Sequence, residues 1–421
     1  MRPWRTEALV GAVLVAALAL LVGATRPVRA EAPVARSFST AGLARVSAFL
    51  RGEVAVGKIP GAILLIQQHG KPVLSEMFGL RDAKAARPMT NDAIFRLYSM
   101  SKPITSVAAM MLVDDGRLAL DDAVAKYIPA FADVQVGVPQ ADGKLALQPL
   151  ARPITVRDLL RHTSGITYGF YGSSPVRKLY AQAGLFDGDP DNAQFAERLS
   201  RLPLAEQPGT LWDYGHSTDV LGRVIEVAAG LSLYRFEKER LLDPLGMRDT
   251  AFFVADDAKR SLIAEPLPGD WFDHPVAGIK EATAPHRWES GGAGMVGTIG
   301  DYARFAQMLL NGGEFEDRRY LRRETLALMV SDQIGEATGV RKDPEFYFPG
   351  ADSGFGLGFA VRTRATPLLR AGEYRWDGVG GTFFFIDPAD DMFVICMMQS
   401  PSQRGPIQDD LKRLIYQAMA R

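Results

Sequence analysis

The chain has 421 residues, of which 47% are hydrophobic and 23% are charged, so it can build one large or two medium globular domains and does not have the composition of a disordered chain. Its 48 basic and 49 acidic residues nearly cancel, so the chain lacks the excess of basic residues that is typical of proteins that bind nucleic acid or an anionic membrane surface. The single cysteine, Cys396, excludes an intrachain disulfide and a cysteine-based metal site, and its apolar neighbours predict a buried strand.

The first thirty residues have the organisation of a secretory signal peptide. Arg2 and Arg5 precede an apolar run over 8–24, and a Val-x-Ala pattern ends at Ala30. We expect cleavage after Ala30 and export to the periplasm or the medium. Because an apolar run of about 17 residues is slightly long for a signal peptide and slightly short for a spanning helix, an uncleaved N-terminal anchor is the alternative. Apart from that anchor, no membrane contact is predicted.

After residue 30, helical and strand patterns follow one another without a repeat or a low-complexity tract. Apolar spacing predicts helices over 38–57, from 99 onward, and over 155–160, 219–229, 233–242 and 407–419. Strands are predicted over 61–66, 72–78, 355–361, 382–387 and 392–399, the first two as a hairpin. The stretches 265–290 and 337–354 lack periodicity, and loops of this length usually form functional walls or lids.

This order of elements predicts an α+β fold. An antiparallel sheet is expected to be flanked by the N- and C-terminal helices, with a helical lobe inserted between its strands. We expect a single catalytic domain over 31–421, with an α/β lobe formed by about 31–95 and 296–421 and a helical lobe over about 100–295. The patterns leave the oligomeric state unknown.

The motif Ser99-Met100-Ser101-Lys102 opens a predicted buried helix. Apolar residues after it recur at a spacing of about 3.6, and Pro103 fits because it falls in the first turn, where its missing N–H costs nothing. Ser99 therefore lies at or near a helix N-terminus, and Lys102, three residues later, lies on the same face. Ser101 projects in a different direction and is a poorer candidate.

This pairing of a hydroxyl with an amine has a chemical use. A serine hydroxyl is a weak nucleophile until a neighbouring base takes its proton. Lys102 can be that base if burial or nearby cations bring its pKa well below about 10.4. A Ser-x-x-Lys match also arises by chance in chains of this length, so the motif indicates catalysis only together with other features.

Two further stretches can complete such a site. The segment 208–216 places Tyr214 in a turn before the next helix, where the phenol could share or relay the serine proton if cationic Lys102 lowers its pKa. The alternative is a buried tyrosine that satisfies a backbone carbonyl. The segment 376–382 is a glycine-dense turn that enters a strand, and one of its N–H groups could form an oxyanion hole with the N–H of Ser99. The alternative is an ordinary hairpin turn.

In this order, Ser99-x-x-Lys102, Tyr214-Gly215-His216 and Trp376-x-Gly378 resemble the motifs of the serine β-lactamase and penicillin-binding protein superfamily. They look most like those of class C β-lactamases and of the carboxylesterases that share their fold. Three further stretches are also similar to the family, namely 155–165, 291–295 and 354–358. The resemblance as a whole covers most of residues 40–415.

The resemblance implies a β-lactamase-like serine hydrolase fold and a role for each matching residue. Ser99 would be the acylated nucleophile and Lys102 its activating partner. Tyr214 would be the general base, and the acid for the leaving group. The N–H of Val379, directly after Trp376-Asp377-Gly378, would be the second donor of the oxyanion hole.

Two departures from the family pattern bear on the substrate. Trp376 stands where β-lactam-handling relatives have a lysine for the substrate carboxylate, so anionic β-lactams lose a charge-assisted contact typically worth about 1.5–3 kcal/mol. Neutral or apolar acyl groups are then favoured, as in the esterases of this fold, and Trp376 and Gly378 are expected beside the substrate. His216 replaces an asparagine; it donates to a substrate carbonyl or caps the following helix, which leaves amide recognition open.

Other patterns are interpreted as coincidences. The segment 215–219 is similar to the Gly-x-Ser-x-Gly elbow of lipases, but Asp219 replaces the last glycine and no apolar strand precedes it, so Ser217 is not expected to be a nucleophile. The segment 292–297 matches a dinucleotide fingerprint without its strand and is expected to form a pocket wall. The chain has five histidines, namely His69, His162, His216, His274 and His286. They show no metal-ligand spacing, and neither a metal nor a cofactor is predicted.

The sequence thus predicts an exported serine hydrolase that cleaves carboxylic esters through an acyl-enzyme on Ser99. The alternatives are an amide or D-amino-acid peptide hydrolase, a β-lactamase, and a penicillin-recognising sensor that acylates without turnover. A small-molecule ester or amide is the expected partner, and nucleic acid is not. Whether Lys102 or Tyr214 is the working base stays open, as does the identity of the substrate.

Overall fold

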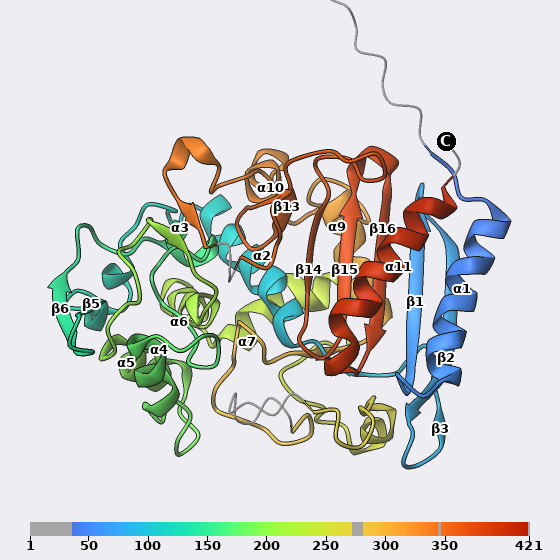
Figure 1. Cartoon of the computed structure of the whole chain (residues 1–421), viewed down its shortest axis with the longest axis horizontal. Helices are drawn as coiled ribbons and strands as arrows, with labels where there is room; N and C mark the ends of the chain where they lie inside the picture. Colours follow the sequence, from blue (N-terminus) through green and yellow to red (C-terminus); the bar gives the residue numbers. More distant parts are fainter. Residues whose placement is uncertain (1–35, 272–280, 344–346, 420–421) are drawn as a thin grey trace, which may run out of the picture. The chain divides into compact units, whose positions relative to one another are not determined.

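Figure 1 shows a computed structural model of the chain, which describes residues 36–271, 281–343 and 347–419. The predicted signal peptide, with its cleavage position after Ala30, lies outside the described residues, and so does His274. Within the described ranges, no helix combines the length and the apolar character needed to cross a membrane.

An antiparallel sheet of eight strands organises the fold. In spatial order the strands are β12 (Ser353–Phe355), β13 (Ala360–Arg362), β14 (Tyr374–Asp377), β15 (Phe383–Asp387), β16 (Met392–Met398), β1 (Gly61–Gln68), β2 (Lys71–Asp82) and β3 (Arg87–Pro88). β16 pairs with β1, with Leu64 opposite Cys396, so the last strand of the chain lies beside the first. Cys396 is buried in this strand, as predicted.

Alternate residues of the central strands belong to two separate cores, because successive side chains of a strand point to opposite faces. Leu64 and Ile66 of β1 pack with α1 (Thr40–Ala55) and α11 (Arg404–Ala418), whereas Ile63 belongs to the larger core on the other face. The two helices lie side by side in Figure 1. Their approach is so close that a Cβ at Gly42 would be 2.5 Å from the Cα of Ala418.

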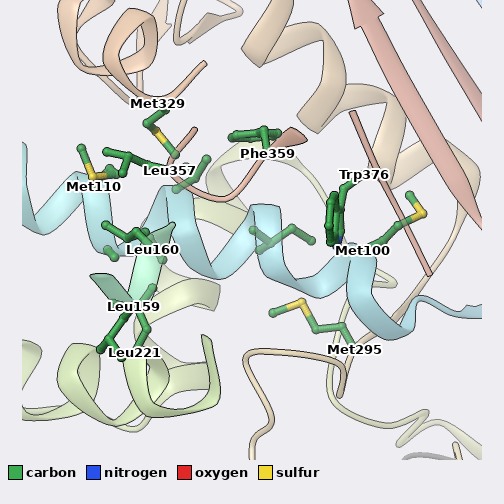
Figure 2. Packing of buried hydrophobic residues seen from close by; sticks show 14 of the residues in the cluster. Met100, Met110, Leu159, Leu160, Leu221, Met295, Met329, Leu357, Phe359 and Trp376 are labelled. Carbon is green, nitrogen blue, oxygen red and sulfur yellow. The ribbon is translucent and has the colours of Figure 1, made fainter. Parts of the chain in front are cut away.

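The larger core surrounds α2 (Ser101–Asp114), which is buried continuously from Ser101 to Leu112. Most of its buried residues are apolar, and the polar exceptions, Ser101, Lys102, Thr105 and Ser106, lie in its first two turns. Figure 2 shows the apolar side chains around the helix, with Trp376 close to Met100. α6 (Ser217–Ala229) packs against α2, and α3 (Val156–Leu160) packs against α6. The first turn of α2 is therefore held in the middle of the protein, between the sheet and the helices.

Shorter elements connect β3 to β12. The other α-helices are α4 (Pro175–Gln182), α5 (Asn192–Ser200), α7 (Leu233–Glu237), α8 (Asp243–Leu245), α9 (Ile299–Leu310) and α10 (Arg323–Met329). The short strands pair as β4 (Phe95–Arg96) with β8 (Val296–Gly297), β5 (Gln135–Pro139) with β6 (Leu145–Pro149), β7 (Leu211–Trp212) with β11 (Arg341–Lys342), and β9 (Glu314–Phe315) with β10 (Arg318–Arg319). The β4–β8 pair lies next to the motif at Ser99, and α9 packs against β16.

The predicted α+β architecture is confirmed, but the strand predicted over 355–361 is wrong. β12 ends at Phe355, the chain turns, and β13 starts at Ala360. In this turn Gly358 has a φ of 96°, and a Cβ on it would lie 2.3 Å from the Oγ of Ser106 in α2. Only glycine fits this tertiary contact, which a local apolar pattern does not reveal. Trp376 also lies within a strand, β14, and the glycine-rich turn follows it.

Candidate active site

Ser99 lies in a short 3-10 turn, η1 (Tyr98–Met100), that runs directly into α2. Tyr98 has a φ of 46°, in the left-handed region that non-glycine residues seldom adopt, so the backbone before Ser99 is strained. The N–H of Leu97 donates to the carbonyl of Met295 at 2.8 Å, and the hydroxyl of Tyr302 donates to the carbonyl of Met100 at 3.1 Å. These bonds hold the half-buried Ser99 on a fixed backbone.

Lys102 is 1% exposed and has no carboxylate in contact with its amine within the described part of the chain. Its Nζ lies 2.7 Å from the carbonyl oxygen of Gly292, 3.2 Å from Ser99 Oγ and 3.3 Å from Tyr168 Oη. Burial lowers the pKa of Lys102 to about 7, although the charge of Asp219 opposes this effect. A large fraction of this amine is therefore neutral near neutral pH.

Tyr214 is the second group that contacts the hydroxyl of Ser99. Its hydroxyl donates to Ser99 Oγ at 2.7 Å, and Lys102 Nζ lies 4.5 Å from the centre of its ring. Burial raises the pKa of Tyr214 above its ordinary value, and its hydrogen bond to Ser99 opposes this only in part. The phenol is thus protonated at neutral pH, which disfavours the phenolate considered from the sequence.

The hydrogen bonds around Lys102 are consistent with a neutral amine. The carbonyl of Gly292 can only accept, so one N–H of Lys102 points there. The hydroxyl of Tyr214 donates to Ser99, which leaves the hydroxyl proton of Ser99 in need of an acceptor. A neutral Lys102 has a lone pair for this proton, whereas an ammonium has none. The arrangement can thus move the proton of Ser99 onto Lys102.

The glycine-rich turn after β14 packs directly on the nucleophile segment. A Cβ on Gly378 would lie 2.3 Å from the carbonyl oxygen of Leu97, and the hydroxyl of Thr382 donates to the same oxygen at 3.3 Å. Gly378 N–H donates to the carbonyl of Thr382 at 2.7 Å, which closes the turn. Among the described residues, none accepts a hydrogen bond from the N–H of Val379 inside this turn. This N–H is available to an oxyanion.

Trp376 forms part of an aromatic wall around Tyr214. Its ring lies 5.5 Å from that of Tyr214, and Phe348 lies 4.8 Å from Tyr214. Trp376 is 4% exposed, and its Nε1 has no hydrogen-bond partner within the described ranges. The structure therefore places an uncharged indole beside Tyr214, the residue whose hydroxyl contacts Ser99.

His216 lies at the start of α6 and bonds to Asp219. Its Nδ1 lies 2.8 Å from Asp219 Oδ2, and its side chain makes no capping bond to α6. Asp219 is itself buried and accepts from Ser290 Oγ at 2.6 Å and from the N–H of Gly292 at 3.0 Å. Burial disfavours its charge, but the hydrogen bonds and charge of His216 keep the pKa of Asp219 low. Asp219 thus fixes Gly292, whose carbonyl holds Lys102.

The structure thus brings Ser99, Lys102 and Tyr214 together. It also adds residues that the sequence did not single out, namely Tyr168 and Asp219. In the sequence, Asp219 only interrupts a lipase-like elbow. The serine of that elbow, Ser217, is buried, and its hydroxyl oxygen lies 2.8 Å from that of Ser164. Within the described ranges, no group of three or more His, Cys, Asp or Glu side chains is arranged to hold a metal ion.

A serine with an amine and a phenol at its hydroxyl, on the first turn of a buried helix beside an antiparallel sheet, defines a class of serine hydrolases. The chain belongs to the Beta-lactamase family, whose model matches residues 46–417.

Relatives of this chain are similar over most of its length. It is 36% identical over 356 residues to protein Rv1367c of Mycobacterium tuberculosis, a match that covers 82% of this chain and 86% of that protein. It is 32% identical over 411 residues to esterase EstB of Burkholderia gladioli, covering 91% of this chain and 98% of EstB. Among solved structures, EstCE1, described as a hydrolase with promiscuous acyltransferase activity, matches with a TM-score of 0.74 and 27% identity over 89% of this chain and 98% of EstCE1. The chain is accordingly a serine hydrolase related to carboxylesterases.

Proposed function

We propose that this protein is an exported carboxylesterase that works through an acyl-enzyme on Ser99. The observation that carries the proposal is the contact of Ser99 Oγ with two groups of opposite use. A buried amine with a pKa of about 7 lies 3.2 Å away, and a protonated phenol lies 2.7 Å away. The first is suited to accept a proton near neutral pH, and the second is suited to donate one.

In the proposed first step, neutral Lys102 takes the hydroxyl proton of Ser99 while Oγ attacks the acyl carbon of the ester. The carbonyl π electrons move to oxygen, and the N–H groups of Ser99 and Val379 hold the resulting oxyanion. The intermediate then expels the alkoxide, which takes its proton from Tyr214, and Tyr214 regains a proton from Lys102. The products are a free alcohol and an acyl ester on Ser99.

In the second step, water replaces the alcohol. Neutral Lys102 again takes a proton, now from water, and the hydroxide attacks the acyl carbon within the same oxyanion hole. Collapse of the intermediate expels Ser99 Oγ, which takes this proton back from Lys102, and the carboxylic acid leaves. Asp219 and Gly292 take no part in bond making; they position Lys102.

Two observations support an ester as the substrate. The position that would meet the carboxylate of a β-lactam is occupied by Trp376, a neutral ring, so this contact contributes no charge attraction. EstB, which matches nearly the whole chain, is named an esterase. Amide, D-amino-acid peptide and β-lactam hydrolysis are the competing activities, and a sensor that acylates once is the non-enzymatic competitor.

Export is proposed on the sequence of residues 1–30 alone, with cleavage after Ala30. N-terminal sequencing of the protein recovered from the medium or periplasm would test this. A mature N-terminus at Glu31 is expected. Recovery of the intact N-terminus in the membrane fraction would instead favour the uncleaved anchor.

The enzymatic proposal is tested by turnover of 4-nitrophenyl acetate, butyrate and octanoate beside nitrocefin. We expect fast ester cleavage, little nitrocefin turnover, and no activity in Ser99→Ala, whose stability should match that of the unmodified protein. Ser217→Ala is the matched control, because it removes a serine hydroxyl whose hydrogen-bond partner is Ser164 and not a group of the site. This variant should remain active.

Three results would contradict the proposal. Ester turnover retained in Ser99→Ala would exclude this serine as the nucleophile. Nitrocefin turnover as efficient as ester turnover would favour a β-lactamase. A single burst of 4-nitrophenol equal to the enzyme concentration, with a stable acyl adduct by mass spectrometry, would favour the sensor.

A further inference from the structure

A second feature adjoins the active site on the far side of its aromatic wall. A cavity of about 660 Å³ lies between β13 and β14 and the start of α11. Tyr171, Phe348 and Trp376 line it, and the same three rings surround Tyr214 at centroid distances of 6.3, 4.8 and 5.5 Å. The cavity thus begins one aromatic ring away from the phenol that contacts Ser99.

Arg362 lines this cavity as a buried cation without a partner. It is only 8% exposed, and among the described residues no acceptor or carboxylate lies within hydrogen-bonding or ion-pair distance of its guanidinium. Its Nε is shielded from solvent as well. Burying a charge without hydrogen bonds is costly, and buried charges in proteins are normally paired. An occupant that accepts hydrogen bonds and carries negative charge would remove this cost.

The charges around Arg362 do not balance. One fully buried carboxylate, Glu373, serves three cations: it forms an ion pair with Lys412, lies 3.9 Å from Arg375 Nη1, and has its pKa lowered by the charge of Arg362 as well. Tyr416 donates to the same carboxylate at 3.0 Å. The inner part of the cavity therefore carries an excess of positive charge.

The other charged groups of the cavity do not cancel this excess. Arg404 and Asp377 neutralise each other through two bonds of 2.5 and 2.8 Å, and Arg413 pairs with Asp410 at the surface. Asp409 is exposed at the rim. A ligand carboxylate would find the required donors on Arg362.

We propose that this cavity is a subsite for a carboxylate carried by the substrate at the end remote from the scissile ester. The inference rests on the proposed esterase function and names its substrate class as monoesters of dicarboxylic acids. Arg362 would bind the carboxylate, because a guanidinium fork matches its two oxygens. Arg375 would attract the carboxylate through its positive charge without binding it, since its guanidinium already donates to Ser353 Oγ at 3.2 Å and to the carbonyl of Pro349 at 2.7 Å.

The position of the cavity explains why the charge must be remote. Trp376, Arg375 and Arg362 all line the cavity, and of these three Trp376 is the one whose ring lies against Tyr214, at a centroid distance of 5.5 Å. A carboxylate next to the scissile bond, as in a β-lactam, would meet the indole. Only a chain that passes the aromatic wall brings its carboxylate to Arg362. Phe348 and Trp376 offer apolar surface to the methylene groups in between.

The test compares 4-nitrophenyl hydrogen adipate with methyl 4-nitrophenyl adipate, which has the same chain and a neutral end. For the unmodified protein, we expect a KM at least about tenfold lower for the anionic ester, the effect of one charge-assisted contact. Arg362→Gln should raise this KM about 10- to 100-fold and leave kcat and the KM of the neutral ester within about twofold. Arg364→Gln is the matched control, because it removes the same charge from an arginine that is 67% exposed.

Two further measurements keep the test decisive. If Arg362→Gln does not fold, Arg375→Gln should still weaken the preference for the anionic ester. In the unmodified protein, the KM should fall from the succinate through the adipate to the suberate monoester, as the chain becomes long enough to bring its carboxylate to Arg362. Equal KM values for the charged and neutral adipate esters, or a preference unchanged in Arg362→Gln, would overturn the subsite.

Failure of the subsite and failure of the esterase proposal give different results. Cleavage of the neutral ester that depends on Ser99, without an anionic preference, overturns the subsite alone. If no ester is cleaved, calorimetric titration with adipate decides: binding to the unmodified protein that Arg362→Gln abolishes supports an anion site, and no binding overturns it. Adipate binding at Arg362 in an active esterase with no anionic preference would also overturn the inference, because the anion would not be part of the substrate.

Discussion

The pH dependence of ester cleavage follows from the burial of Lys102. Its pKa of about 7, against an ordinary 10.5, means that about half of the amines are neutral at pH 7 and about one in a hundred at pH 5. If Lys102 is the base, kcat/KM should rise about tenfold per pH unit below 7 and level off above it, because this parameter reports the free enzyme.

Two variants assign this inflection. Lys102→Arg keeps a cation but has no accessible neutral form, so it should lower kcat/KM about 10²- to 10⁴-fold and remove the inflection near pH 7. Tyr214→Phe removes the proton donor for the leaving group, so it should lower the plateau by a similar factor and keep the inflection.

The assay is the initial rate of 4-nitrophenyl butyrate cleavage between pH 5 and 9, corrected for spontaneous hydrolysis and read at the isosbestic wavelength of 4-nitrophenol. Ser99→Ala supplies the enzyme blank at each pH. An inflection that persists in Lys102→Arg would refute Lys102 as the base. An inflection that Tyr214→Phe abolishes would return the role of base to the phenol.

Three further variants test the structure around the site. Lys102→Met should raise the free energy of unfolding at pH 7 by up to about 5 kcal/mol, the cost of lowering a pKa from 10.5 to about 7. The variant should also lack the rise in the free energy of unfolding that the unmodified protein shows between pH 7 and 10.5, where only the unfolded lysine binds a proton. A free energy of unfolding at pH 7 below that of the unmodified protein would contradict the predicted cost of burying Lys102. Gly378→Ala should lower kcat about 100-fold by displacing the Val379 N–H. Gly52→Ala is the control, because a Cβ there meets nothing within 4 Å. Equal kcat values for the two variants would contradict a role of this turn in the oxyanion hole. Glu237→Gln should change stability at pH 7 by less than about 1 kcal/mol or increase it, because burial raises the pKa of Glu237 well above its ordinary value and so favours the protonated acid, which an amide resembles. Because Glu237 ionises above pH 4.5 in the unfolded chain but at a higher pH in the folded protein, the unmodified protein should lose stability as the pH rises above 4.5. Glu237→Gln should lose less. If chemical denaturation gives the same dependence of the unfolding free energy on pH for both proteins, the pKa of Glu237 is not raised.

The sequence by itself determined the features that depend on local spacing. A serine and a lysine three residues apart at the start of a helix must lie on one face, and the structure places their side chains 3.2 Å apart. The apolar run around Cys396 was sufficient to predict a buried strand, since β16 is covered on both faces. The order of the motifs was sufficient to indicate the family.

Tertiary structure decided the features that depend on residues far apart in the chain. The predicted strand over 355–361 became a hairpin because Gly358 turns against Ser106 of α2, a contact that no local pattern contains. Asp219 became a support of Lys102 through Gly292, and Arg362 became a buried cation in a cavity walled by α11.

The chemistry of Lys102 shows the same division. Its position in the motif follows from the sequence, but its pKa depends on how completely the surrounding elements exclude water and on the charges that they bring near. Spacing along a helix fixes which groups can meet. Burial and charge, which set what those groups do, are properties of the folded assembly of distant segments.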